Sequence, residues 1–441
     1  MATAPNHSEA FVRWFRQVAP YVHDFGGRTF VVAFGGELMA ERSRFASFIH
    51  DVNVLASLEI RLVLVHGARP QIEAEMKAKG QRSRYAQGLR ITDEAALTAV
   101  KHAAGVLRVE IEALLSQGLP NSPMARAQIR VASGNYITAR PIGVRKGIDF
   151  QFAGAVRKVD TAALASHLDV DDIVLVPHLG YSLTGEVFNL AWEDVAESVA
   201  VALKADKLLM YTDRLPEDRR GHIVSELTAD QAAALAAKKG GLTPATMRAL
   251  EHLARAVKAG VGRAHLLSRR APGSLLLELF THAGVGTMVT AGAVQKLRPA
   301  RIEDVRGIVA LIEPLEADGT LVKRNRDLIE AEIGNFLVVE HDGVIVGCAA
   351  LYPFPEEKSA EFACLAVAES YRDAGFGERL LLACHERAKA LKLRQLFALT
   401  THAEHWFLEQ GFRAADVGAL PSRRQALYNW RRGSKVFLKR I

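Results

Sequence analysis

Apolar runs separated by helical patterns fill the first two thirds of the chain. Buried strands are predicted at 29–36, 61–65, 172–177 and 207–213, and the first of these ends in a Gly-Gly turn. Between the first two strands, apolar residues recur with helical spacing over 45–55. Apolar strands that alternate with helices are typical of a parallel or mixed sheet covered by helices on both faces. The sequence therefore predicts an α/β domain.

A change of pattern marks the end of this domain. The last strand ends near 286–289, and mostly small residues fill 291–295. A new strand and helix begin within 296–305. We therefore expect two domains, residues 1–292 and residues 296–441.

The second domain begins with a predicted hairpin and continues to a glycine-rich turn. Apolar runs at 335–340 and 344–350 flank an Asp-Gly dipeptide, which is typical of hairpin turns. A third apolar run, 362–367, precedes the segment 372–377, after which a helical pattern starts. Glycines let the backbone approach a ligand closely, and the N–H groups at a helix start attract a pyrophosphate. This segment is a candidate anion site.

Composition limits the classes of function. The chain has 441 residues, of which 49% are hydrophobic and 24% charged, as expected for a globular protein of two or three domains. The net charge is +7, but Lys and Arg are spread along the chain without aromatic-interleaved clusters, so no nucleic-acid partner is expected. No apolar run reaches about 18 residues and no signal pattern starts the chain, so neither membrane spanning nor export is expected.

Cysteine usage indicates a reducing compartment. Cys348, Cys364 and Cys384 lie in apolar surroundings in the last third of the chain. An odd number without paired spacing argues against a disulfide framework and for a cytoplasmic protein. No metal site is expected.

The glycine-rich segment resembles the acetyl-CoA-binding motif of the GNAT N-acetyltransferases. The resemblance implies that the segment wraps the cofactor pyrophosphate, that the preceding strand binds the pantetheine arm, and that the N–H of Leu365 or Ala366 polarises the thioester carbonyl. Direct attack by the amine is favoured over an acetyl-cysteine at Cys364, because a small buried thiol is ordinarily a core residue. The implied cofactor-binding residues are Cys364, Leu365, Ala366, Val367, Arg372, Asp373, Ala374, Gly375, Phe376 and Gly377.

Residues 10–290 resemble the amino-acid kinase fold, an α/β/α sandwich, and are most similar to acetylglutamate kinases and bacterial N-acetylglutamate synthases. The matching motifs are the Gly35-Gly36 turn and the segments 66–70, 207–213 and 274–287. The chain is thus expected to pair an amino-acid kinase-like domain with a C-terminal GNAT domain.

The kinase-like domain departs from the kinases where phosphate chemistry would occur. Ala33 stands where the kinases carry a lysine, Arg69 occupies the second glycine-rich turn, and the segment 188–192 lacks an aspartate that the kinases have. Phosphoryl transfer depends mainly on charge neutralisation and positioning. We expect no kinase activity and interpret the domain as regulatory.

In arginine-inhibited relatives, arginine binds between the N-terminal helix and the final βα segment. The resemblance therefore implies an allosteric L-arginine site, in which Glu278 is the natural partner for a guanidinium. The matching residues are Tyr21, Lys207, His265, Glu278, Gly284 and Gly286.

Acetyl transfer also needs a base and a site for the acceptor. By resemblance to the synthases, Glu361 is the expected base and Thr400 the expected proton relay, while the residue that protonates the CoA thiolate is unassigned. L-glutamate has two carboxylates, so its site should contain cations. Basic clusters at 321–326 and 428–435 resemble the synthases' substrate segments. The expected substrate-binding residues are Arg324, Arg432 and Ser434, with Lys435 as an alternative.

The resemblances imply an acetyl-CoA:L-glutamate N-acetyltransferase that opens arginine biosynthesis and is inhibited by L-arginine. An acetylglutamate kinase and an amino-acid sensor that binds acetyl-CoA without transfer are the alternatives. A homo-oligomer is expected, since the apolar helix over 11–22 would be buried by a neighbouring copy, as in hexameric relatives.

Overall fold

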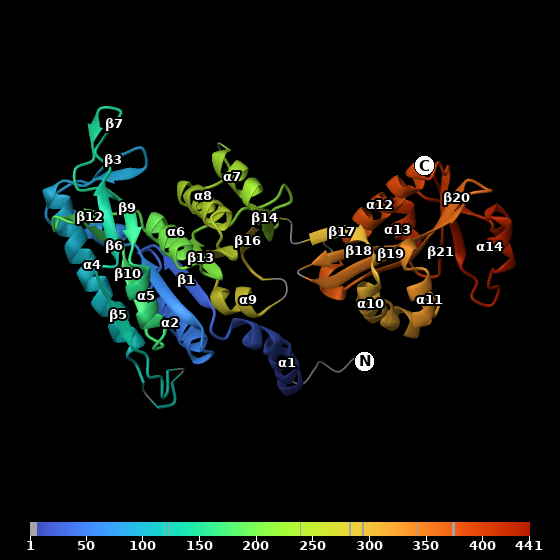
Figure 1. Ribbon diagram of the computed structural model, residues 1–441, viewed down its shortest axis with the longest axis horizontal. Coiled ribbons are helices and arrows are strands. Elements are labelled where there is room, and N and C mark those ends of the chain that lie inside the picture. The colour runs from blue at the N-terminus through green and yellow to red at the C-terminus, as the bar shows by residue number, and fades with distance from the viewer. Residues whose placement is uncertain are drawn as a thin grey trace. The chain divides into compact units, whose positions relative to one another are not determined.

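The computed structural model describes residues 7–118, 120–122, 124–238, 240–281, 284–292, 295–341, 343–372 and 375–441. The chain forms two compact units, residues 1–292 and residues 293–441 (Figure 1). Among the described residues, no helix is both long and apolar enough to cross a membrane.

An eight-stranded sheet forms the centre of the first unit, in the order β14-β16-β15-β13-β1-β2-β10-β5. All neighbouring strands are parallel except β15 and β16, so the expected mixed sheet is confirmed. The strands, in chain order, are β1 (Thr29–Phe34), β2 (Arg61–His66), β5 (Val131–Ser133), β10 (Ile173–Pro177), β13 (Lys207–Thr212), β14 (Glu226–Thr228), β15 (Arg263–Ser268) and β16 (Thr287–Thr290).

Helices cover both faces of this sheet because its strands are apolar on both sides. Phe30, Val32 and Phe34 of β1 pack into one core cluster, whereas Val31 and Ala33 pack into the other. The first face carries α1 (His7–Phe25), α2 (Arg42–Ser57), α3 (Arg69–Ala78), α4 (Glu94–Leu115) and α9 (Ser274–Phe280). The second face carries α5 (Thr161–Leu168), α6 (Trp192–Ala202), α7 (Ala229–Ala237) and α8 (Pro244–Lys258).

A smaller sheet and two hairpins, which the apolar pattern did not indicate, complete the first unit. The smaller sheet has the order β12-β11-β6-β9, and the pairs β3–β4 and β7–β8 form separate ribbons. Their strands are short, and several are exposed, so they lack the long apolar runs that identify buried strands. The elements are β3 (Arg84–Ala86), β4 (Leu89–Ile91), β6 (Ile137–Pro141), β7 (Val144–Arg145), β8 (Ile148–Asp149), β9 (Gly154–Val159), β11 (Leu179–Tyr181) and β12 (Val187–Asn189).

The second unit contains a seven-stranded sheet in the order β17-β18-β19-β20-β21-β23-β22. The expected hairpin is formed by β18 and β19, and the expected strand near 362–367 is β20. The strands are β17 (Gln295–Pro299), β18 (Phe336–His341), β19 (Val344–Phe354), β20 (Ser359–Val367), β21 (Gln395–Thr400), β22 (Arg413–Ala415) and β23 (Lys435–Arg440).

Helices again cover both faces. One core cluster contains residues of α12 (Phe376–Ala390) and α13 (Glu404–Glu409), and the other contains residues of α10 (Val305–Ala317) and α11 (Arg326–Ala331). The remaining elements are the short helix α14 (Ser422–Ala426) and the 3₁₀ turns η1 (Ile302–Asp304), η2 (Ile333–Asn335), η3 (Glu369–Tyr371) and η4 (Val417–Ala419).

The sheet opens in its middle. β20 and β21 are parallel neighbours, and they pair through Ser359–Glu361 and Gln395–Phe397. Beyond that point β21 continues along β23, while β20 continues along β19 with a register shift. Cys364 lies at this irregularity with a φ of 52°, in the left-handed region. The diverging strands leave backbone groups of β20 available to a ligand.

Candidate active site

A pocket of about 300 Å³ in the second unit brings most of the predicted transfer residues together. They come from β20, from the segment before α11 and from the segment before β23, which are far apart in the sequence. The predicted residues that line it are Arg324, Glu361, Cys364, Arg432 and Ser434.

Glu361 is 8% exposed and forms an ion pair that sequence reasoning missed. Arg424 Nε donates to Glu361 Oε2 at 2.7 Å, and Arg424 Nη2 donates to Oε1 at 3.1 Å. Such a two-point contact fixes the orientation of the carboxylate. Arg424 lies 63 residues after Glu361 in a run of basic residues, so no local signal identifies it.

The structure distinguishes Arg324 from its basic neighbours. Arg324 is partly buried and lines the pocket, whereas Lys323 and Arg326 are exposed. The guanidinium of Arg326 is already paired with Glu330, at 2.6 Å from Nε to Oε1. Arg324 is therefore the cation of this cluster that is in position to meet a substrate.

Backbone carbonyl groups hold the guanidinium of Arg432, but one of its buried N–H groups makes no hydrogen bond within the described residues. Its Nη2 donates to the carbonyl oxygens of Gly319 at 3.1 Å and Thr320 at 2.7 Å. Its Nε is buried and has no hydrogen-bond partner among the described residues. A buried donor without a partner is costly, so a ligand carboxylate that reached it would be stabilised.

Ser434 lies beside Arg432 and is 8% exposed. The Tyr428 hydroxyl donates to the Ser434 carbonyl oxygen at 2.6 Å, which fixes the backbone of this segment. The alternative cation, Lys435, is exposed and pairs with Glu404.

Cys364 is buried, and burial raises the pKa of its thiol to about 11. A thiol with such a pKa carries almost no thiolate near neutral pH and is a poor nucleophile. This agrees with the preference for direct attack. On the same strand, Ala366 is buried, while Leu365 and Val367 are partly buried.

The glycine-rich segment leads into α12 in the expected way. Gly375 occupies the N-cap position with a φ of 73°, which favours glycine, and no side chain caps the helix. A Cβ on Gly377 would lie 3.3 Å from Cζ2 of Trp406, so this position also favours a residue without a side chain. Arg372 is exposed, and the predicted Asp373 and Ala374 lie outside the described residues.

The side chain of Phe376, one of the predicted cofactor-binding residues, belongs to the core of the second unit. Phe376 is 1% exposed and packs in the core, with its ring centroid 5.8 Å from that of Tyr371. Only its backbone N–H, in the first turn of α12, remains for an anion.

Thr400 ends β21 and is buried. Its Oγ1 accepts hydrogen bonds from the N–H groups of His402 at 3.2 Å and Ala403 at 2.9 Å. Because the oxygen acts as acceptor in both contacts, the Thr400 hydroxyl can still donate its own proton in a further hydrogen bond. Among the described lining residues of the pocket, the neighbour Leu399 is present and Thr400 is not, so Thr400 is set back from the acceptor site.

In the first unit, the predicted guanidinium partner Glu278 is already engaged. Its side chain is 5% exposed, and the His265 ring Nδ1 lies 2.7 Å from its Oε1. Its Oε2 accepts from the N–H groups of Val285 at 2.8 Å and Gly286 at 2.7 Å. Burial acts to raise the pKa of Glu278, but these bonds outweigh it and hold the pKa below its usual value. Gly284 has a φ of 60°, and a Cβ there would lie 2.6 Å from Oε2 of Glu278.

Tyr21 and Lys207 share an aromatic cluster beside this carboxylate. The Tyr21 ring lies 5.9 Å from Phe25 and 6.5 Å from Phe280, between ring centroids. Lys207 is buried, with its Nζ 5.0 Å from the Phe25 ring centroid. Lys207 and the neighbouring His265 lie on adjacent strands, β13 and β15. The predicted arginine-site residues are thus neighbours.

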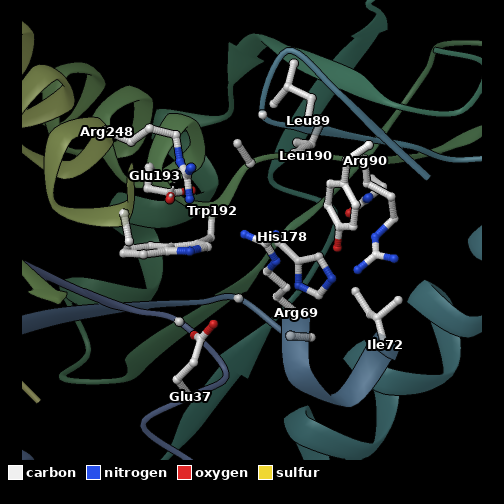
Figure 2. A pocket seen from close by; sticks show the side chains of 18 of the residues that line it. Glu37, Arg69, Ile72, Leu89, Arg90, His178, Leu190, Trp192, Glu193 and Arg248 are labelled. Atoms are coloured by element: carbon white, nitrogen blue, oxygen red, sulfur yellow. Dashed lines mark hydrogen bonds and ion pairs between the residues drawn. The ribbon is translucent and has the colours of Figure 1, made fainter. Parts of the chain in front are cut away.

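The indole of Trp192 lies close to Gly35 and Gly67, one glycine from each of the two glycine turns of the kinase-like unit. A Cβ on Gly67 would lie 2.6 Å from Cδ1 of Trp192, and one on Gly35 would lie 3.8 Å from its Nε1. Ala33, in the place of the kinase lysine, is fully buried in β1. Figure 2 shows Trp192 at one side of the cleft that these turns border.

Two buried histidines, His66 and His178, lie next to these turns. Burial lowers the pKa of His66 to about 4 and that of His178 to about 3, and the proximity of His66 adds to the lowering for His178. Both are neutral in the folded state near neutral pH.

We expect the stability of this unit to fall with acidification below about pH 6.5, the usual pKa of histidine. The unfolded chain takes up these protons between pH 6.5 and about 4, whereas the folded chain does not. Each histidine therefore removes about 1.4 kcal/mol of unfolding free energy per pH unit. Urea unfolding at pH 7 and pH 5, followed by hydrogen exchange in β2 and β10, measures the loss. His178→Gln should reduce the slope, and the exposed control His222→Gln should not; equal slopes in all three proteins would contradict this assignment.

Known protein families match both units. Residues 28–268 match the amino acid kinase family, and residues 332–414 match the acetyltransferase (GNAT) domain. An amino-acid acetyltransferase from Ralstonia nicotianae is 49% identical over 435 residues, which cover 98% of this chain and 96% of that protein. Another from Azotobacter vinelandii is 48% identical over 432 residues, covering 98% of this chain and 99% of that protein.

The chain belongs to the amino-acid acetyltransferases. The N-acetylglutamate synthase from Neisseria gonorrhoeae, solved with coenzyme A and L-arginine, is also similar, with a TM-score of 0.82 and 39% identity over 98% of this chain and 99% of that one. The same protein solved with coenzyme A and N-acetyl-glutamate gives a TM-score of 0.62 over the same shares. The predicted fold class, an amino-acid kinase-like unit followed by a GNAT unit, is confirmed.

Proposed function

We propose that this acetyltransferase moves the acetyl group of acetyl-CoA to the amine of L-glutamate, giving N-acetyl-L-glutamate and CoA, the opening step of arginine biosynthesis. The observation that carries the proposal is the pocket beside β20, where a buried carboxylate faces a set of cations. The likeness to the Neisseria gonorrhoeae synthase, solved with coenzyme A and N-acetyl-glutamate, supports the choice of substrates.

The charges of the pocket suit an acceptor with two carboxylates. Arg324 and Arg432 lie on its wall, while Glu361 is neutralised by Arg424. The unused Nε of Arg432 is a donor for one substrate carboxylate, and Arg324 is the donor for the other. An acceptor with fewer negative charges would leave one of these cations without a partner.

The fit of acetyl-CoA rests on the opening between β20 and β21 and on the start of α12. Past Glu361 the edge of β20 turns away from β21, so its backbone is available to the pantetheine arm. The uncapped first turn of α12, after Gly375, offers N–H groups to the pyrophosphate. Acetyl-CoA supplies the activated acyl group, and the chain binds and orients it.

Glu361 takes a proton from the glutamate ammonium group. The free amine attacks the thioester carbonyl carbon, a C–N bond forms, and the developing oxyanion is stabilised by the N–H of Leu365 or Ala366. The carbonyl then re-forms and the C–S bond breaks, so that CoA leaves as a thiolate. The attacking nitrogen gives up its extra proton and the thiolate takes up one proton, which leaves a neutral amide and CoA thiol. Arg424, through its two hydrogen bonds to the carboxylate, keeps Glu361 oriented toward the pocket.

The test is an assay of CoA release by the full chain. L-glutamate is expected to be the preferred acceptor over L-aspartate, L-glutamine, L-lysine and glycine. A strong preference for another amine would refute the substrate assignment. Binding of acetyl-CoA without CoA release for any amine would favour a sensor.

The kinase alternative is disfavoured by the first unit. Ala33 leaves a transferring phosphoryl group without its cation, and the indole of Trp192 lies against Gly67 in the second glycine turn. Incubation with ATP and N-acetyl-L-glutamate is expected to give no acylphosphate above background.

L-arginine is proposed to bind the segment around Glu278 in the first unit and to inhibit the transferase. The neighbour solved with L-arginine supports this. Binding would exchange the contacts of the Glu278 carboxylate with His265 for contacts with the guanidinium. The coupling free energy between arginine binding and the transfer site is expected to be about 1–3 kcal/mol.

Glu278→Gln should raise the arginine concentration for half inhibition about 10- to 100-fold, because a charge-assisted hydrogen bond is lost. The uninhibited rate should stay nearly unchanged, since this residue belongs to the first unit. The exposed Glu251→Gln is the matched control and should be inhibited like the wild type. If Glu278→Gln keeps wild-type sensitivity, arginine binds elsewhere; if the wild type ignores millimolar arginine, the regulatory proposal fails.

Homo-oligomer formation is part of the same proposal. Within α1, Phe15 is 63% exposed and Val12 is 44% exposed, while Val18 packs into the core of its own unit. Light scattering of the full chain at micromolar concentration would give the number of subunits. A monomer would refute the proposal that a neighbouring copy buries the apolar residues of α1.

A further inference from the structure

A tyrosine of β19 stands next to the proposed base without lining the described part of the acceptor pocket. Tyr352 pairs with Glu361 across the antiparallel strands β19 and β20. Opposite residues of such a pair point to the same face of the sheet, with Cβ atoms about 4.5–5.5 Å apart. Tyr352 and the pocket residue Ala363 pack against the same core cluster, which lies under α10 and α11. The strand pairing therefore fixes the Tyr352 ring relative to Glu361.

The hydroxyl of Tyr352 connects the two ends of α11. It donates to Glu332 Oε2 at 2.9 Å, and Glu332 is the C-cap residue of this helix. At the other end, Arg324 directly precedes the N-cap residue Asn325, and the Arg324 guanidinium hydrogen-bonds with the same hydroxyl. A tyrosine hydroxyl has one proton, which Glu332 takes, so its oxygen is left to accept from a guanidinium, which can only donate. The hydrogen bonds therefore run from Arg324 to Tyr352 and from Tyr352 to Glu332.

The electrostatics of this contact keep Arg324 charged and Tyr352 neutral. Burial acts to lower the pKa of Arg324, but nearby negative charge, including that of Glu361, and the hydrogen bond with Tyr352 hold that pKa above its usual value. Burial raises the pKa of the Tyr352 hydroxyl above its usual range. Tyr352 thus keeps its proton near neutral pH, so it acts by holding Arg324 and not by transferring a proton.

The main chain of Arg324 is anchored separately. Its N–H donates to Glu316 Oε1 of α10 at 2.8 Å, so the segment before α11 is tied to a neighbouring helix. The long side chain is then the adjustable part of the contact with a substrate. Ordering such a side chain costs conformational entropy on binding, and a partner that orders it beforehand removes that cost. Tyr352 is this partner in the free protein.

The same contact sets the distance between the cation and the base. Arg324 is held from β19, and Glu361 stands opposite Tyr352 on β20, so one strand pair fixes their separation. L-glutamate and L-aspartate differ by one methylene between their two carboxylates. A cation that is fixed in place suits one of these spacings, whereas a mobile cation adapts to both, which reduces discrimination between the two acceptors.

We propose that Tyr352 is a positioning residue that holds the Arg324 guanidinium at a fixed distance from Glu361 and thereby makes the pocket prefer L-glutamate to the shorter L-aspartate. Glu332 supports this role, because it takes the hydroxyl proton and leaves the oxygen to accept from Arg324. The inference rests on the proposed transfer to L-glutamate and adds a determinant of acceptor length to it.

Tyr352→Phe tests the role, because it removes the hydroxyl and keeps the ring in the core. Initial rates of CoA release are measured with L-glutamate and with L-aspartate. The KM for L-glutamate should rise about tenfold, as expected when a hydrogen bond to a charged group is lost, while kcat and the KM for acetyl-CoA should change little. The ratio of kcat/KM for L-glutamate to that for L-aspartate should fall severalfold. A merely destabilised protein would lose rate with both acceptors alike, so the ratio separates positioning from loss of structure.

A second variant tests the connection to Glu332. Glu332→Ala should shift the KM and the acceptor ratio in the same direction, and adding it to Tyr352→Phe should cause no further loss, because both act through one hydroxyl. The matched control is Glu330→Ala, which removes the same charge from α11 but breaks only the pair with the exposed Arg326. A second control, Tyr181→Phe, removes a hydroxyl from β11 of the first unit. Both controls should behave like the wild type.

The outcomes separate this inference from the proposed function. A wild-type KM and acceptor ratio in Tyr352→Phe would overturn the role of Tyr352 and leave the transfer to L-glutamate standing. Additive losses in the double variant would also overturn it, since Glu332 would then act apart from Tyr352. If the wild type strongly prefers an amine other than L-glutamate, the proposed function fails, and this inference fails with it.

Discussion

Glu361→Gln is expected to lower kcat for acetyl transfer about 10²- to 10⁴-fold, which is the usual contribution of a general base. The amide keeps the size of the side chain but cannot take the ammonium proton, and it loses the ion pair with Arg424. The KM for acetyl-CoA should change little, since the cofactor contacts proposed here are backbone groups of β20 and α12. Initial rates of CoA release over both substrate concentrations measure these parameters.

The pH profile distinguishes a lost base from a distorted pocket. An enzyme without its base should regain rate as the solution pH rises and free amine becomes abundant, whereas a distorted pocket should stay slow at every pH. Glu356→Gln is the matched control, because Glu356 is exposed in the turn before β20. If Glu361→Gln keeps more than a tenth of the wild-type kcat, another group is the base.

Arg432→Ala is expected to lower kcat/KM for L-glutamate roughly 30- to 700-fold, corresponding to about 2–4 kcal/mol for truncating one member of a desolvated, hydrogen-bonded charge pair. The loss should appear mainly in the KM for L-glutamate, because the proposed contact is with a substrate carboxylate that does not react. The KM for acetyl-CoA is the internal reference. Steady-state kinetics with each substrate varied in turn separates the two.

Arg431→Ala supplies the control for this charge. Arg431 is the adjacent arginine, but it is exposed, and it does not line the pocket in the described part of the chain. Arg431→Ala changes the net charge by the same amount as Arg432→Ala. It should leave kcat/KM for L-glutamate within about twofold of the wild-type value. Equal losses in both variants would mean that a general electrostatic field, and not the Arg432 contact, attracts glutamate.

The central strands of the two largest sheets could be predicted because their signals are local. The strands β1, β2, β10 and β13 are continuous apolar runs of about the length that crosses a buried sheet, and helical spacing fills the gaps between them. The short strands β7 and β8 were missed because they are mainly exposed and carry no such run.

Parts of the candidate site could be located from the sequence, where a residue stands at a recognisable position in a predicted strand or helix. Glu361 stands at the start of an apolar strand, and Gly375 stands before a helix, and the resemblance to the synthases and to the GNAT motif gives each its expected role. Phe376 shows the limit of such reasoning. It belongs to the predicted cofactor motif, but its ring is buried in the core, because the first turn of α12 has one face toward the sheet.

The sequence by itself determined the order of the two domains, the glycine turns and the presence of basic clusters, since propensity and spacing act between near neighbours. Only the tertiary structure decided which cation of a cluster meets the pocket, that Arg424 holds Glu361 across 63 residues, and that Glu278 is already engaged by His265. The physical reason is that burial, ion pairing and desolvation depend on which distant strands the sheet places side by side.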